Sequence, residues 1–80
     1  MPVVLRVDGF TVRIRTGDHT PPHVHVDLSG DEVVINLGDR LNVPHIRDYR
    51  GMARRNVRRA LHIVASNQQL LIKEWLRIYK

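Results

Sequence analysis

The chain has 80 residues, no cysteine and a formal net charge of +5. This length supports one hydrophobic core, so we predict a single domain over residues 1–80. The lack of cysteine excludes disulfides and thiolate metal ligands and is typical of proteins from a reducing cytosol. The N-terminal residues do not resemble a signal peptide, and charged residues interrupt the C-terminal apolar stretch. We therefore expect a cytoplasmic protein that has no membrane partner.

Four strands are predicted before any helix, from short alternating runs that are separated by turn residues. The first two are joined by Asp8-Gly9, a strong two-residue hairpin signal, and the last two by a turn at residues 29–31. The predicted strands are residues 3–7, 10–15, 23–28 and 32–37. Residues 16–22 form a loop before the third strand, and residues 38–50, rich in Gly, Asp, Asn and Pro, are predicted to form a second, longer loop.

Two amphipathic helices are predicted to follow. The first carries apolar residues at i, i+3, i+4 and i+7, and Ser66-Asn67 ends it. A second stripe contains Leu71, Trp75 and Ile78. The predicted fold is therefore α+β: a four-stranded, mainly antiparallel sheet with both C-terminal helices packed on one face. No Ser or Asp stands where a cap of the first helix is expected, so the sequence leaves its start undefined.

Positive charge is concentrated in the C-terminal part of the chain. Residues 1–48 hold five arginines and seven carboxylates, whereas residues 49–80 hold eight basic residues and one carboxylate. The predicted first helix contains four arginines, which we expect to bind nucleic acid or an acidic partner protein: Arg54, Arg55, Arg58 and Arg59. The structural alternative, an ordinary solvated helix face, is equally compatible with the composition.

Three of the five histidines lie between residues 18 and 26, which read Asp-His-Thr-Pro-Pro-His-Val-His-Val. On a strand, side chains two residues apart share a face, so His23, His25 and Asp27 are expected to lie together on the polar face of the sheet. His19 falls in the preceding loop, where we expect it to hold a turn. Pro21 and Pro22 are expected to stiffen the same loop.

This run, together with Val-Leu-Arg-Val-Asp-Gly at residues 4–9, resembles a small bacterial family, the domain-of-unknown-function family 4160. The arginine-rich helix and the closing Glu74-Trp75 are similar as well, so the resemblance extends over nearly the whole chain. It implies a bacterial protein that is paired with a second small protein. It also implies, for some members, the toxin role in a toxin–antitoxin module. The resemblance implies no particular chemistry.

Three readings of the histidine run stay open. In the first, His23 and His25 transfer protons and Arg13 and Arg15 stabilise phosphate charge, giving metal-independent RNA cleavage. In the second, His-x-His binds a metal with His19 or Asp27, but the nearby arginines disfavour a cation, so we expect neither metal nor cofactor. In the third, the histidines are structural and the basic helix alone binds RNA or an antitoxin-like partner.

Overall fold

The computed structural model describes residues 3–15, 17 and 20–79. Within them, one antiparallel sheet is followed by two helices, and every strand neighbours the next one along the chain, in the order β1-β2-β3-β4-β5. The strands are β1 (Val3–Val7), β2 (Phe10–Arg13), β3 (His23–Leu28), β4 (Asp31–Asn36) and β5 (His45–Arg50). The helices are α1 (Arg54–Ser66) and α2 (Gln68–Tyr79). The predicted α+β class and the antiparallel sheet with two C-terminal helices are confirmed.

The prediction of four strands was wrong, because the second half of the expected loop at residues 38–50 is β5. Two features hide this strand in the sequence. It lies at the edge of the sheet and all six of its side chains are exposed, so it lacks a buried face. Its pairing with β4 also shifts between Val34 and Ile35, where Arg47 is the additional residue of a bulge. The bulge breaks the period-2 alternation by which strands are recognised.

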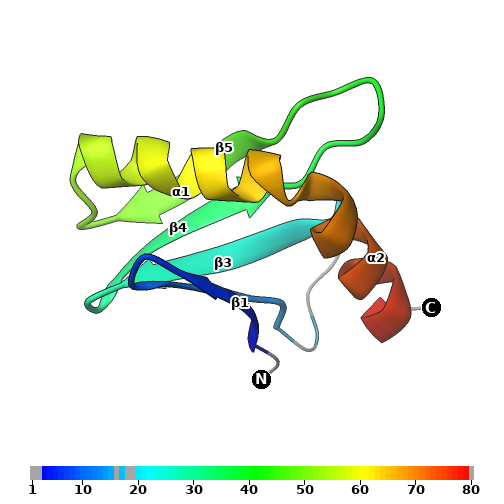
Figure 1. Ribbon diagram of the computed structural model, residues 1–80, viewed down its shortest axis with the longest axis horizontal. Coiled ribbons are helices and arrows are strands. Elements are labelled where there is room, and N and C mark those ends of the chain that lie inside the picture. The colour runs from blue at the N-terminus through cyan, green and yellow to red at the C-terminus, as the bar shows by residue number, and fades with distance from the viewer. Residues whose placement is uncertain (1–2, 16, 18–19, 80) are drawn as a thin grey trace.

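Most of the core lies between one face of the sheet and α1, and α2 adds Leu71 and Trp75 to it from the end of the sheet. Alternate residues of the central strands are fully buried on this face, among them Phe10, Val26 and Ile35. In Figure 1, α1 lies over the sheet beside β4 and β5, whereas α2 lies at the end of the sheet where β3 begins. The burial of this apolar surface is the main stabilising term, at about 25 cal/mol per Å². The fold thus leaves one sheet face and the outer side of α1 for other roles.

The two helices are separated at Asn67, as expected. Its backbone N–H donates to the carbonyl of Val64, and its side-chain amide donates to the carbonyl of Ile63, so it closes the last turn of α1. At the other end, Ala53 occupies the N-cap position without a side-chain hydrogen bond, which fits the lack of a capping Ser or Asp. The break at Asn67 directs α2 away from α1 toward β3.

Residues 38–44 form a fixed loop whose structure depends on Gln68. The side-chain amide of Gln68 donates to three backbone carbonyls, those of residues 37, 39 and 42, at 2.8–3.1 Å. Within the loop, the N–H of Leu41 and the side chain of Asn42 donate to the Asp39 carboxylate and hold its pKa below the ordinary value. This turn is therefore expected to loosen only as the pH falls through that lowered pKa. Gly38 has a φ of 69°, and a Cβ there would lie 2.3 Å from the carbonyl oxygen of Asn42.

Replacing Gln68 by alanine is expected to release this loop. The change leaves three carbonyls without their shared donor, so we expect a loss of about 1–2 kcal/mol in the free energy of unfolding. Amide hydrogen exchange at Leu41 and Asn42 should become faster. Gln69→Ala is the matched control, because Gln69 is the exposed neighbour of Gln68 on the same helix. Equal exchange rates in the two variants would contradict the assignment of Gln68 as the anchor.

Candidate functional site

His23 and His25 lie on the sheet face opposite α1, as predicted, but they are not solvent-exposed. Their exposed fractions are 5% and 7%, which makes them the two buried polar residues of the described chain. The rings contact each other in a T-shaped arrangement with centroids 5.4 Å apart. The polar face of the sheet was expected to be exposed to solvent. That expectation is wrong at the centre of the face, where both histidines are buried.

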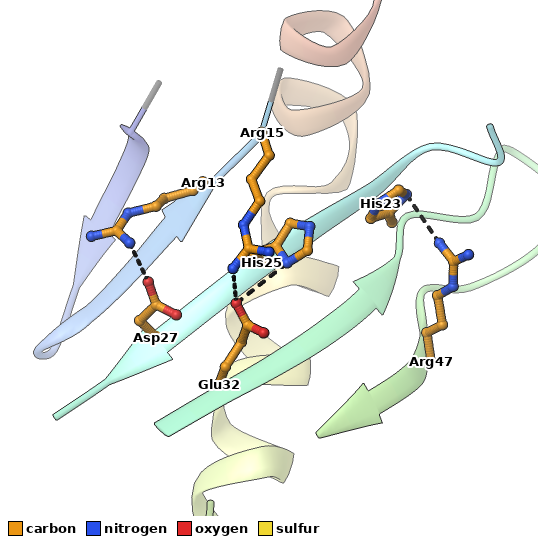
Figure 2. Close-up of polar contacts among 7 residues, drawn as sticks. All are labelled: Arg13, Arg15, His23, His25, Asp27, Glu32 and Arg47. Atoms are coloured by element: carbon orange, nitrogen blue, oxygen red, sulfur yellow. Dashed lines mark hydrogen bonds and ion pairs between the residues drawn. The ribbon is translucent and has the colours of Figure 1, made fainter. Parts of the chain in front are cut away.

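His23 is held by contacts on three sides. Its Nδ1 lies 2.9 Å from the carbonyl oxygen of Pro21, and its ring centroid lies 5.3 Å from that of Trp75 on α2. Because a carbonyl can only accept, this shorter contact favours the neutral tautomer with the hydrogen on Nδ1 and the lone pair on Nε2. Arg47 Nη1 lies 3.3 Å from the same Nδ1 (Figure 2), and it can donate to that atom only in the other tautomer, with the hydrogen on Nε2.

His25 lies beside a carboxylate that the sequence reasoning missed. Its Nδ1 is 3.4 Å from Oε2 of Glu32, and the same oxygen accepts a hydrogen bond from Nη2 of Arg15. Figure 2 shows Arg15 and His25 both approaching the same oxygen of Glu32. A carboxylate beside Nδ1 can orient an imidazole, as the acid of a catalytic triad does, although at 3.4 Å the Glu32–His25 contact is an ion-pair distance and not a hydrogen bond. This is the arrangement on the sheet face that most resembles catalytic machinery.

Arg13 and Arg15, predicted to bind phosphate, are each paired with a carboxylate. Arg13 Nη1 lies 2.7 Å from Oδ2 of Asp27, and Arg15 pairs with Glu32. The register places Asp27 directly opposite Glu32, and two like charges in such a cross-strand pair repel each other. Arg13 on β2 and Arg15 just after it relieve that repulsion, since each pairs with one of the two carboxylates. Much of their charge is therefore used within the protein, which reduces what this face offers to a phosphate.

Glu32→Gln is expected to cost more stability than Asp27→Asn. Glu32 serves two partners, one of them the buried His25, so we expect a loss of about 1–2 kcal/mol in the free energy of unfolding. The Arg13–Asp27 pair joins two half-exposed side chains, and such pairs contribute at most about 1 kcal/mol. Urea unfolding of the two variants measures the difference, and a reversed order would contradict the bridging role of Glu32.

The four arginines predicted to bind a polyanion lie along one exposed side of α1. All four are exposed, and none forms an ion pair with another residue in the described part of the chain. They occupy the N-terminal half of the helix, whose first turn contains no acidic residue. The helix macrodipole already makes this end positive, so arginines here lower the stability of the helix. We call this surface, formed by Arg54, Arg55, Arg58 and Arg59, the basic surface.

A shallow depression of about 410 Å³ lies within the basic surface. Three of its arginines line it, together with His62, Ile63 and one acid, Asp8. The guanidinium of Arg59 lies 5.3 Å from the centre of the Phe10 ring, a cation–π contact that restricts this side chain. Because α1 covers the apolar sheet face, the basic surface and the histidines lie on opposite sides of the sheet. The sequence could not show this separation.

The remaining candidate residues lie around the start of β3. The carbonyls of Pro21 and Pro22 accept from His23 and from the N–H of Leu37, so both prolines are joined to the sheet. His19 lies outside the described residues. Among the described residues, no group of three His, Cys, Asp or Glu side chains has the geometry of a metal site. Arg47 escaped prediction because β5 was expected to be a loop. Glu32 could have been found from the 29–31 turn, which sets it opposite Asp27.

The fold and its surfaces define a small α+β domain that carries an enclosed histidine pair and, on the other side, a basic helix. The chain belongs to the family described as a domain of unknown function (DUF4160), whose model matches residues 9–76. Comparison with curated proteins and with solved structures gives no match. No helix formed by the described residues is long and apolar enough to cross a membrane.

Proposed function

We propose that this protein binds nucleic acid through the basic surface of α1, and that RNA is the preferred ligand. The observation that carries the proposal is the contrast between the two sets of arginines. Arg13 and Arg15 are paired with carboxylates, whereas the arginines of α1 are exposed and form no ion pair with another described residue. Guanidinium groups of this kind bind phosphate oxygens bidentately, and a row of them follows a phosphate backbone.

Local energetics also support this proposal. A row of arginines at the positive end of a helix is unfavourable for folding, and proteins tend to break such local rules at functional surfaces. The binding mode is expected to rely on charge rather than on base recognition. α1 packs on the sheet along its apolar side, and the helix pair does not form a helix-turn-helix arrangement that could enter a major groove.

The proposal is tested by titrating a fluorescently labelled single-stranded RNA with the protein over a series of salt concentrations. Binding through phosphates predicts a linear fall of the logarithm of the association constant with the logarithm of salt concentration, by about 0.7 per phosphate contact. A duplex DNA and a strongly acidic peptide serve as competitors. If RNA does not bind even at low salt while the acidic peptide binds tightly, the ligand of the basic surface is an acidic protein and not nucleic acid.

For the cellular role, we propose the toxin-like component of a bacterial two-protein module. The support is the family resemblance together with a basic surface that an acidic antitoxin could neutralise. Co-expression with the product of the adjacent gene tests this role. The expected result is growth inhibition by this protein alone, relief by the second protein, and co-purification of the two.

A second candidate function, metal-independent RNA cleavage, is favoured by one observation, the approach of Glu32 to His25. An imidazole oriented by a carboxylate is suited to take the 2′-hydroxyl proton, and a second imidazole is suited to protonate the leaving oxygen. The partner imidazole is His23, whose ring contacts that of His25. Arg47, close to His23, supplies a cation beside the pair.

The two functions are separated by variants of the histidines. Both rings are buried, so His25→Gln and His23→Gln, which keep much of the volume, are preferred to alanine, with circular dichroism as a check of folding. Cleavage predicts loss of RNA hydrolysis with RNA binding retained. RNA that stays intact with wild-type protein, both free and on ribosomes, would leave binding as the function.

A further inference from the structure

The outer edge of β5 has the features of a pairing surface. β5 is an edge strand, so one side of its backbone has no neighbouring strand among the described residues. Arg47 contacts the ring of His23, and the Asp48 carboxylate accepts from the N–H of Tyr49, but neither forms an ion pair with another residue of the described chain. Ile46 and Tyr49 are 37% and 50% exposed. Edge strands with apolar side chains are templates for further pairing.

The backbone direction of β4 can be deduced from one hydrogen bond. The N–H of Leu37 donates to the carbonyl of Pro22, just before β3. In an antiparallel ladder, the N–H and C=O groups of one residue point to the same side, and the side alternates along the strand. Ile35 and Val33 therefore direct their backbone groups toward β3. The intervening residues direct theirs toward β5: Glu32, Val34 and Asn36.

The same alternation fixes the outer edge of β5. The β5 partners of those three residues direct their backbone groups inward: Arg50, Asp48 and His45. Ile46 and Tyr49, which stand opposite Ile35 and Val33, therefore direct their N–H and C=O groups outward. Two residues separate these outward positions instead of one, because Arg47 is the additional residue of the bulge.

We propose that a second copy of this chain pairs with β5 in antiparallel orientation about a two-fold axis between Arg47 and Asp48. The sequence from His45 to Arg50 is complementary to itself in this register. Ile46 stands opposite Tyr49 of the other copy, and Arg47 stands opposite Asp48 of the other copy, so each pair occurs twice. The ends of the strand place His45 opposite Arg50.

The bulge makes this register consistent with the faces of the sheet. Ile46 and Tyr49 lie on the helix side, because they pair with the buried Ile35 and Val33. Asp48 pairs with Val34 on the other side, and Arg47 reaches His23 on that same side (Figure 2). Apolar side chains thus meet apolar ones, and opposite charges meet on the other face. Without the additional residue, Arg47 and Asp48 would lie on opposite faces.

The two copies would form one continuous sheet with both α1 helices on the same face, which is a form of strand addition. This dimer is independent of the proposed RNA binding, since its contacts involve β5 and not the basic surface. Its contact surface is a single strand edge, so the dimer is expected to dissociate reversibly on dilution.

Sedimentation velocity of the full chain over a dilution series tests the proposal. Wild-type protein should show a concentration-dependent monomer–dimer equilibrium. Arg47→Asp and Asp48→Arg each place like charges opposite each other twice, so each should weaken dimerisation about tenfold or more. The double variant Arg47→Asp/Asp48→Arg restores complementary pairs and should recover the dimer. Arg6→Asp, the same change on the opposite edge strand, is the matched control and should dimerise normally.

Circular dichroism of each variant establishes folding, and Asp48→Arg keeps the test valid if loss of the Arg47–His23 contact unfolds Arg47→Asp. Wild-type protein that stays monomeric at every concentration would overturn the proposal. So would single variants that dimerise as well as wild type, or a folded double variant that stays monomeric. The result that supports the Arg47–Asp48 register is that both single variants are monomeric while the double variant dimerises like wild type.

Discussion

Trp75→Ala is expected to lower the free energy of unfolding by about 3–5 kcal/mol, the usual cost of removing a buried aromatic side chain. Trp75 is 2% exposed, and its ring centroid lies 4.3 Å from that of Tyr79 and 5.3 Å from that of His23. Its removal therefore leaves a cavity where α2 meets β3. The hydroxyl of Tyr79 donates to the carbonyl of Arg15, so α2 is also joined to the segment after β2.

The measurement is urea unfolding followed by circular dichroism, because Trp75 is the only tryptophan and its loss removes the fluorescence signal. Leu76→Ala is the control, since Leu76 is the next residue on α2, is 58% exposed, and should cost about 0.5 kcal/mol or less. A domain of this size can be fully unfolded by the alanine substitution, so Trp75→Phe supplies an intermediate variant. A loss below about 1 kcal/mol for Trp75→Ala would contradict the docking of α2 through this ring.

The triple variant Arg55→Gln/Arg58→Gln/Arg59→Gln is expected to weaken RNA binding about 100-fold near 0.1 M salt. The size follows from counterion release: each lost phosphate contact lowers the logarithm of the association constant by about 0.7 at this concentration. The salt dependence should become shallower by about two units for the same reason. Fluorescence anisotropy with a single-stranded RNA measures both quantities.

A second triple variant with the same change in net charge is the control: Arg6→Gln, Arg40→Gln and Lys73→Gln. These side chains are exposed, and they lie on β1, on the 38–44 loop and on α2. If the basic surface is the binding site, the control should lose less than about tenfold in affinity. Equal losses in the two triple variants would mean that RNA responds only to net charge, and the assignment to α1 would fail.

Local sequence patterns predicted the elements that have one buried side. β3 was predicted with its observed bounds, since its polar–apolar alternation lies between a Pro-Pro pair and Ser29-Gly30. The predicted apolar stripe of α1 was Val57, Ala60, Leu61 and Val64; three of these are buried, Leu61 is partly buried, and Ile63 is buried in addition. β5 was missed because it has no buried face and contains a bulge. An element can be predicted from sequence where burial of one side produces a periodic pattern of apolar residues, and β5 has no such pattern.

The environment of the histidines could not be predicted in the same way. That His23 and His25 share a face follows from their spacing alone. Their burial depends on α2, which is distant in the sequence and brings Trp75 against His23. The pairing of Arg15 with Glu32 depends on strand order, since β3 lies between their two segments. Contacts of this kind are fixed by tertiary structure and leave no periodic trace in the sequence.

The placement of α1 behind the sheet has a consequence for how mutations combine. The apolar core lies between the basic surface and the Glu32–His25 pair, and no side chain described above contacts both. Free-energy changes at sites separated in this way add to within about 0.5 kcal/mol. A double-mutant cycle between Arg58→Gln and Glu32→Gln is therefore expected to give a coupling energy close to zero. Each side of this small domain could then change during evolution without constraining the other.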